Sequence, residues 1–123
     1  MMVLVDTSVW IEHFRLGNAG LKALLLNEEA VSHPFVIGEL ACGNLSNRDE
    51  ILTLLDDLPK AKTLDDDEVL AFIERQKLYG LGIGLVDVHL LASSLLSHSL
   101  LWTLDRKLNA VAGQKKILYD PRG

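Results

Sequence analysis

Short runs of apolar and β-branched residues alternate along this chain with longer stretches that have the spacing of amphipathic helices. The short runs predict strands at Met2–Val5, Ala30–Ser32, Ala61–Leu64, Leu100–Leu104 and Lys116–Tyr119. The longer stretches predict helices near Thr7–Arg15, Ala19–Asn27, Pro34–Gly43, Asp49–Leu58, Asp65–Tyr79, Leu85–Ser97 and Arg106–Ala112. Strands that alternate with helices of this length predict a mostly parallel sheet of about five strands, covered by helices on both faces.

Local signals at the expected helix ends agree with this assignment. Pro34 suits the first turn of a helix, where its missing N–H costs nothing, and Gly43 and Gly80 suit helix C-termini. The run Asp65–Glu68 places negative charge at a helix start, where it complements the helix dipole. Because an apolar stripe follows this run, we interpret its acids as a solvated helix start and not as a metal site.

The composition is that of a globular protein. With 49% hydrophobic and 24% charged residues, the chain of 123 residues is expected to form one domain over residues 1–123. The single cysteine, Cys42, cannot form an intramolecular disulfide, and the first apolar run is cut at Asp6 with no basic segment before it. Both features favour a cytoplasmic location. The longest apolar region, Gly80–Trp102, contains Asp87 and two histidines and is too polar to span a membrane.

Four carboxylates lie within or directly after apolar runs: Asp6, Glu39, Asp87 and Asp105. Carboxylates are rarely buried unless they are paired or bind a metal. Asp6 and Asp105 each end an expected strand and start a helix, whereas Glu39 and Asp87 lie on helices next to strands. Because ligands of parallel sheets collect beyond the carboxyl ends of the strands, all four can approach one edge. The sequence therefore predicts an oxygen-ligand cage for divalent cations, which indicates metal-dependent phosphodiester chemistry.

Each acid also has an ordinary structural interpretation. Asp6 and Asp105 could be helix N-caps, and Asp87 could be an acid in a first helical turn. Glu39 is harder to explain in this way, because no cation is found among its helical neighbours Phe35, Val36, Cys42 and Gly43. An ionised glutamate without a partner would be costly to bury there. The joint occurrence of the four acids is therefore more informative than any one of them.

Hydroxyl and basic residues accompany the acids. Thr7, Ser8 and Thr103 are placed to orient carboxylates or water at a metal site, with local capping or packing as the alternative. The candidates for binding phosphates are basic residues near the C-terminal edge: Arg106, Lys107, Lys115 and Lys116. For each of these, a solvated surface position is at least as good an interpretation. The net charge of −5 argues mildly against a generic nucleic-acid binder, but this argument fails if metal neutralises the acids.

The segments around the four acids form a series that covers nearly the whole chain. They read Val5-Asp6-Thr7-Ser8, Ile37-Gly38-Glu39-Leu40, Gly84-Leu85-Val86-Asp87-Val88-His89-Leu90-Leu91-Ala92 and Leu101-Trp102-Thr103-Leu104-Asp105-Arg106. Each is weak alone, but in this order they resemble the PIN-domain ribonucleases, and within them the VapC-type toxins of bacterial and archaeal toxin–antitoxin pairs. His89, where the family often has a small residue, and Leu104, which separates Thr103 from Asp105, are departures that remove no carboxylate.

The resemblance implies a three-layer α/β/α sandwich and an endoribonuclease that depends on Mg²⁺ or Mn²⁺. It implies catalytic and metal-binding roles for the four acids Asp6, Glu39, Asp87 and Asp105. Such metals activate a water, orient the scissile phosphate and stabilise the leaving oxygen. The resemblance also implies an RNA substrate, a homodimer and a cognate antitoxin protein bound to a groove of the early helices, which carry Trp10, Phe14 and Phe35. A basic antitoxin segment would suit the acidic pocket.

Two other functions remain open on the residues alone. An aspartate-dependent phosphoryl-transfer domain would have a second Asp two residues after the first, but Ser8 occupies that position. A non-catalytic α/β interaction module would use the acids as caps and ion-pair partners. Other chemistry has little support, because the four histidines show no metal-type spacing, Cys42 has no activating cation nearby, and a Walker-type sequence is absent.

Overall fold

The fold is built on a short parallel sheet, seen in the computed structural model, which describes residues 1–122. The strands are β1 (Val3–Val5), β2 (Ala30–Val31) and β3 (Leu100–Trp102). Their order is β2-β1-β3, so β1 is the central strand and the chain reaches the two edges on opposite sides of it. This arrangement places the topological switch point at the carboxyl ends of β1 and β3.

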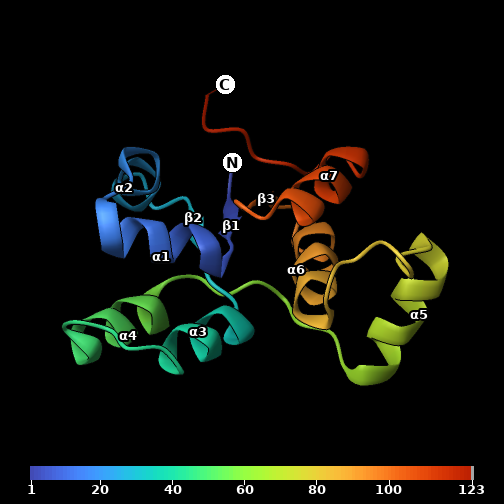
Figure 1. The fold of residues 1–123 in the computed structure, drawn as a ribbon, viewed down its shortest axis with the longest axis horizontal. Helices are drawn as coiled ribbons and strands as arrows, with labels where there is room; N and C mark the ends of the chain where they lie inside the picture. The colour runs from blue at the N-terminus through green and yellow to red at the C-terminus, as the bar shows by residue number, and fades with distance from the viewer. Residues whose placement is uncertain (123) are drawn as a thin grey trace.

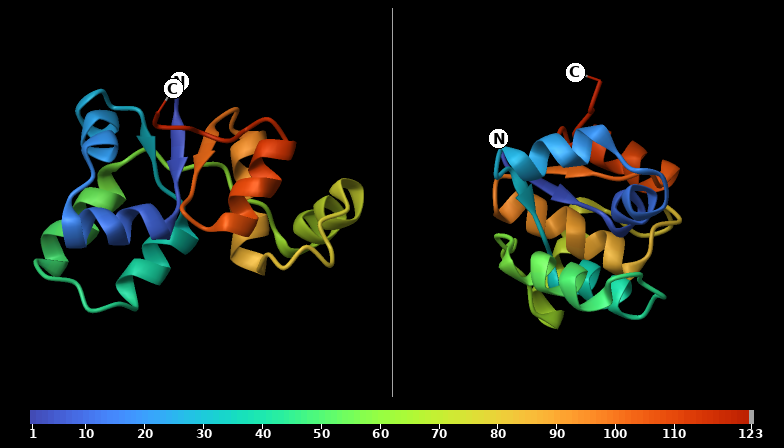
Figure 2. Two further views of the ribbon diagram at one scale, coloured as in Figure 1. Left: turned by 45° about the horizontal axis from the view of Figure 1, so that its top comes forward. Right: turned by 90° about the vertical axis from the view of Figure 1, so that its left-hand side faces the viewer.

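Seven helices surround the sheet within residues 1–122. They are α1 (Thr7–Leu16), α2 (Ala19–Leu26), α3 (Pro34–Ala41), α4 (Arg48–Asp57), α5 (Asp66–Gln76), α6 (Leu85–Leu96) and α7 (Arg106–Gln114). Each lies where the hydrophobic spacing predicts it, with ends that differ by a few residues. In Figures 1 and 2, α1 to α4 lie on one side of the strands and α5 to α7 on the other. The predicted α/β class with a parallel sheet is confirmed.

The expectation of about five strands is wrong, because the described residues form three. The segments expected to be the fourth and fifth strands each contribute one isolated parallel bridge, Ser32 to Lys60 and Leu101 to Leu118. At the sheet edge formed by β2, Pro34 follows the strand after two residues and begins α3, so the pairing with the segment at Lys60 stops there. The apolar pattern of these segments arises because Ala61 and Ile117 are buried in the core. A segment can be buried without forming a continuous ladder of hydrogen bonds with a neighbouring strand.

Helix α6 lies in the interior of the molecule. Its residues from Val88 to Ser94 are all buried, and it packs against both β3 and α5. A helix that is buried on every side along seven successive residues must be surrounded by other elements. Asp87 directly precedes this buried run, so the core that encloses α6 also determines where this carboxylate emerges.

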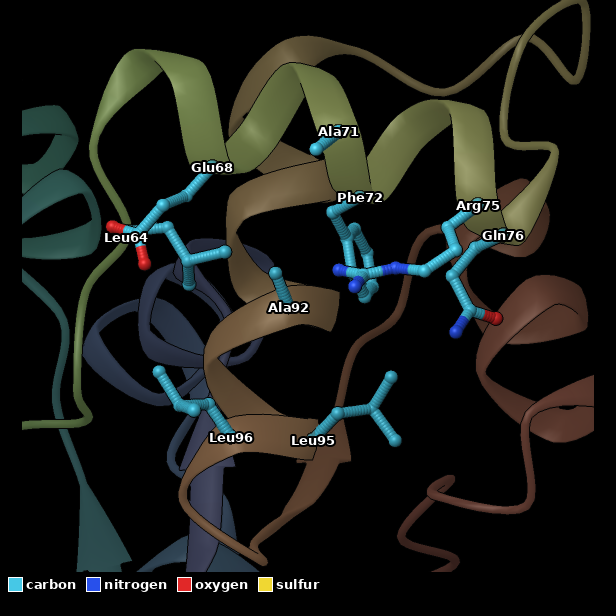
Figure 3. Close-up of a pocket in the computed structure, with 9 residues that line it drawn as sticks. All are labelled: Leu64, Glu68, Ala71, Phe72, Arg75, Gln76, Ala92, Leu95 and Leu96. Atoms are coloured by element: carbon cyan, nitrogen blue, oxygen red, sulfur yellow. The ribbon is translucent and has the colours of Figure 1, made fainter.

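Helix α5 lies on the outside of the molecule, beyond α6 (Figure 1). A cavity of about 580 Å³ lies between the two helices, lined by Leu64, Glu68, Ala71, Phe72, Arg75, Gln76, Ala92, Leu95 and Leu96 (Figure 3). None of the four acids lines this cavity. No described helix has the length and apolar composition needed to cross a bilayer. The single domain over residues 1–123 stays a prediction, and its last residue, Gly123, lies outside the described residues.

Candidate active site

Asp6 lies directly after β1 and is only 7% exposed. It occupies the N-cap position of α1, but its side chain makes no capping hydrogen bond. Instead, its Oδ2 accepts hydrogen bonds from the hydroxyl groups of Ser8 at 2.7 Å and Thr103 at 2.8 Å. The capping interpretation of Asp6 is therefore wrong, and two hydroxyls orient its carboxylate.

The same two hydroxyls join the ends of β1 and β3. Thr103 Oγ1 accepts a hydrogen bond from the backbone N–H of Asp105 at 3.0 Å. Ser8 Oγ accepts one from the N–H of Leu104, also at 3.0 Å. Each hydroxyl thus donates to Asp6 and accepts from the loop after β3. An apolar replacement would leave polar groups unpaired on both sides, at about 1–3 kcal/mol for each buried group.

Thr7 connects Glu39 to this arrangement. Its Oγ1 donates a hydrogen bond of 2.6 Å to Oε1 of Glu39 on α3. The expectation that Glu39 is embedded among apolar side chains is wrong, because this residue is exposed. The buried residues of α3 are Val36 and Leu40, which point toward the core and leave Glu39 on the open side of the helix.

Asp87 lies in the first turn of α6 and is half-buried. Its Oδ2 accepts a hydrogen bond of 3.1 Å from the N–H of Gly84. Burial raises the pKa of Asp87, and the hydrogen bond from Gly84 opposes this rise. The negative charges of Asp6, Asp105 and Glu39 raise its pKa further. No lysine or arginine of residues 1–122 is among the groups that shift it.

Asp105 caps helix α7. Its Oδ1 accepts a hydrogen bond of 2.8 Å from the N–H of Leu108, and the residue is exposed. The capping interpretation is therefore confirmed for this acid. Capping occupies only one of its two carboxylate oxygens, so it does not conflict with a second role beside the other three acids.

The structure thus brings the four predicted acids to one region, from the ends of β1 and β3 and from helices α3 and α6. The charges of Asp6, Asp105 and Glu39 are close enough to raise the pKa of Asp87, but the four carboxylates do not surround a common point. Within residues 1–122, no three His, Cys, Asp or Glu side chains converge tightly enough to enclose a metal ion. The donor set still fits a hard cation, because Mg²⁺ keeps several waters and needs only one or two direct carboxylate ligands.

The basic candidates separate into two pairs. Arg106 and Lys107 are exposed in the first turn of α7, next to Asp105. Lys115 and Lys116 follow the other end of this helix, whose nine residues span about 13 Å. Lys115 is engaged there, since its Nζ donates to the carbonyl of Gln76 at 3.4 Å. The structure therefore brings only the first pair near the acids.

His33 has a structural role that the sequence analysis missed. Its Nδ1 accepts a hydrogen bond of 3.0 Å from the N–H of Phe35 and so caps α3. Its Nε2 lies 3.1 Å from Ser93 Oγ on α6. Because Nδ1 is an acceptor, Nε2 carries the proton and donates to Ser93. The signal in the sequence was the position of His33 directly before Pro34, where a helix cap is expected.

This histidine links the helices that carry Glu39 and Asp87. It is 1% exposed, and burial together with the nearby His89 lowers its pKa to about 4. A ring contact adds to the link, since the centroids of Phe35 on α3 and His89 on α6 are 4.6 Å apart. The spacing of these two acids therefore depends on the contacts of His33 with Ser93 and of Phe35 with His89.

The sequence matches the family model of the PIN domain over residues 3–114. The chain belongs to the PIN domain family. The matched range includes all four acids and the hydroxyl residues Thr7, Ser8 and Thr103.

Two curated relatives of this PIN-domain chain are named Ribonuclease VapC32, from Mycobacterium tuberculosis strains CDC 1551 / Oshkosh and H37Rv. Each is 45% identical to this chain over 117 residues, which cover 94% of both sequences. The resemblance to VapC-type PIN ribonucleases, first seen in the segments around the acids, is confirmed.

Proposed function

We propose that this PIN-domain chain is an endoribonuclease that requires Mg²⁺ or Mn²⁺ and acts as the toxin of a toxin–antitoxin pair. The observation that carries the proposal is the cluster of four carboxylates at the switch point of the sheet, where burial and like charges raise the pKa of Asp87. The relatives named Ribonuclease VapC32 support RNA as the substrate and hydrolysis as the reaction. No observation favours a phosphoryl-transfer domain or a non-catalytic module.

The four carboxylates share a pattern of hydrogen bonding. Each uses one oxygen to hold its own position: Asp6 Oδ2, Glu39 Oε1, Asp87 Oδ2 and Asp105 Oδ1. The other oxygen of each carboxylate has no hydrogen-bond partner within residues 1–122. This is the arrangement expected of preorganised ligands, because the fixed oxygen sets the direction in which the free oxygen points.

These four acids would hold the metal in our proposal. A bound divalent cation supplies an activated water and stabilises the negative charge on the leaving oxygen. Ser8 and Thr103 hold Asp6, and Thr7 holds Glu39, so that both carboxylates keep their orientation while substrate enters. Arg106 and Lys107 follow Asp105 in the first turn of α7 and would bind phosphates of the RNA backbone.

The direct test is cleavage of a mixed pool of structured RNAs by the purified chain in Mg²⁺, in Mn²⁺ and in EDTA. We expect cleavage with either metal, none in EDTA and none by the Asp6→Asn variant. Asp67→Asn is the matched control, because Asp67 is an exposed acid in the first turn of α5 and contributes nothing to the pocket. Cleavage that persists in EDTA, or that Asp6→Asn retains, would refute the proposal.

We further propose that an antitoxin binds between α1 and α3. A cavity of about 260 Å³ lies there, with Ile11, Phe14 and Leu40 among its mostly apolar lining and with Glu39 and Arg15 as its charged residues. Its apolar surface suits a segment with apolar side chains, and its two opposite charges suit a segment that carries a basic and an acidic group. Of the other aromatic residues expected at this groove, Trp10 is fully buried in the core and Phe35 packs against His89.

Co-expression with the protein encoded by the neighbouring gene tests this partner. We expect a complex that inhibits cleavage, and we expect Ile11→Glu to prevent the complex while leaving cleavage intact, because Ile11 is 45% exposed. A complex that Ile11→Glu does not weaken would place the partner elsewhere. The homodimer and the cytoplasmic location stay predictions.

A further inference from the structure

Lys107 lies across Gly82, a glycine of the loop between α5 and α6. A Cβ atom built on Gly82 would lie 2.8 Å from Nζ of Lys107, 3.0 Å from Cδ and 3.2 Å from Cε. The outer half of the lysine side chain therefore occupies the space that any other residue would need. Gly82 also has φ +76°, a conformation that residues with a side chain rarely adopt.

This contact joins the two segments that carry Asp87 and Asp105. Lys107 follows Asp105 by two residues, in the first turn of α7. Gly82 precedes Gly84 by two residues, and the N–H of Gly84 donates to the carboxylate of Asp87. The lysine consequently lies next to the segments that carry Asp87 and Asp105, where α6 and α7 begin.

The ammonium group of Lys107 is not engaged by an acid of the protein. The ion pairs formed within residues 1–122 join Met1 to Glu29, Lys60 to Asp56 and Arg122 to Asp120, and none of them includes Lys107. Lys107 is exposed, and its ammonium group donates no hydrogen bond to another described residue. Its charge is therefore available to an anion that arrives from solution.

We propose that Lys107 binds an RNA backbone phosphate next to the scissile one and that Gly82 is the positioning residue that holds it there. This role rests on the proposed endoribonuclease activity. An exposed lysine normally loses considerable side-chain entropy on binding. A lysine whose stem already lies against the loop loses less, so the contact is stronger than a mobile side chain would make.

A phosphate contact of this kind contributes affinity without reading the base. Lys107→Ala should raise KM by about fivefold for RNAs of different sequence, the equivalent of one exposed charge pair, and leave kcat unchanged. It should also lower the slope of log KM against log salt by about 0.7, the value for one phosphate contact on a single strand. Lys107→Arg should restore the slope, because it keeps the charge.

Gly82→Ala should change KM and the salt slope in the same direction, because the new methyl group displaces the ammonium. Gly80→Ala is the matched control: Gly80 lies in the same loop at φ +72°, but nothing lies within 4 Å of its Cβ position. Both alanines strain the backbone, and only Gly82→Ala meets Lys107. In a Lys107→Ala background, Gly82→Ala should have no further effect on the slope, since the group it displaces is gone.

The outcomes separate this inference from the proposed function. If the unmodified chain cleaves no RNA with metal, the proposed function fails and this role fails with it. If the unmodified chain cleaves and Lys107→Ala keeps the full salt slope, the phosphate contact is refuted while the nuclease stands. If Gly82→Ala leaves KM and the salt slope unchanged, or changes them equally with and without Lys107, the positioning role of Gly82 is refuted while the phosphate contact stands.

Discussion

Acid should destabilise this protein through His33. The imidazole is buried and neutral, caps α3 and donates to Ser93 on α6. Its pKa is about 4 in the folded protein, below the ordinary value of 6.5. In the unfolded chain the ring takes up a proton as the pH falls below 6.5, whereas the folded protein takes it up only near pH 4. The free energy of unfolding must therefore decrease between these two values.

The size of the effect follows from the difference in pKa. A pKa of about 4 in place of 6.5 corresponds to about 3 kcal/mol when the pH is below both values. Between pH 7 and pH 4.5, about 2 kcal/mol of this loss should appear. This loss is a large fraction of the free energy of unfolding of a typical domain, which is roughly 5–15 kcal/mol.

The matched variant is His33→Asn, which keeps an acceptor for the N–H of Phe35 but has no titrating ring. Unfolding in urea, followed by the fluorescence of the buried Trp10 and Trp102, gives the free energy at each pH. At pH 7 the variant should be less stable by about 1 kcal/mol, because the bond to Ser93 is lost. At pH 4.5 it should be the more stable protein. Parallel loss of stability in both proteins would refute the role of His33, since their carboxylates titrate alike.

Three further changes test the site and its surroundings. Asp87→Asn removes a negative charge that burial and three nearby carboxylates disfavour, so calorimetry in EDTA at pH 7 should show a higher melting temperature for this variant. Mg²⁺ or Mn²⁺ should raise the melting temperature of the unmodified chain but not that of the variant. Thr103→Val should lower the free energy of unfolding by about 2 kcal/mol and abolish cleavage, because the carboxylate of Asp6 and the N–H of Asp105 each lose a hydrogen-bond partner. Thr103→Ser keeps the hydroxyl group and should retain both the stability and the cleavage activity. Arg48→Ala should lower the free energy of unfolding by about 0.5–1 kcal/mol, because this side chain donates to two carbonyls at the end of α3; an unchanged urea midpoint would contradict this.

The spacing of hydrophobic residues was sufficient to predict the helices but not the number of strands in the sheet. An amphipathic helix needs an apolar stripe along its own length, so α5 and α7 are visible in the local sequence. A strand needs a partner, and the partner determines how long the ladder runs. The segments at Ala61 and Ile117 have the apolar pattern of strands and are buried, but each pairs around one residue only.

The candidate acids show the same division. Their order along the chain and their places at strand ends and helix starts were sufficient to predict that they meet, because the ends of parallel strands share one edge. Whether an acid caps a helix or faces the pocket could not be predicted, since Asp6 and Asp105 occupy the same kind of position. Asp6 receives two hydroxyl groups and does not cap, whereas Asp105 does cap. That difference arises from Ser8 and from Thr103, and Thr103 lies 97 residues away from Asp6 in the chain.

The sequence by itself determined the α/β class and the seven helices, because each depends on residues that are close together in the chain. It also determined the group of acids, because each of the four lies at a strand end or on a helix that the local pattern predicts. The tertiary structure alone decided the length of the sheet, the exposure of Glu39, the link from His33 to Ser93 and the contact of Lys107 with Gly82. These features depend on which side chains lie side by side after the chain has folded. Contacts between distant residues leave no periodic trace in a single sequence, so they become visible only when the elements are packed together.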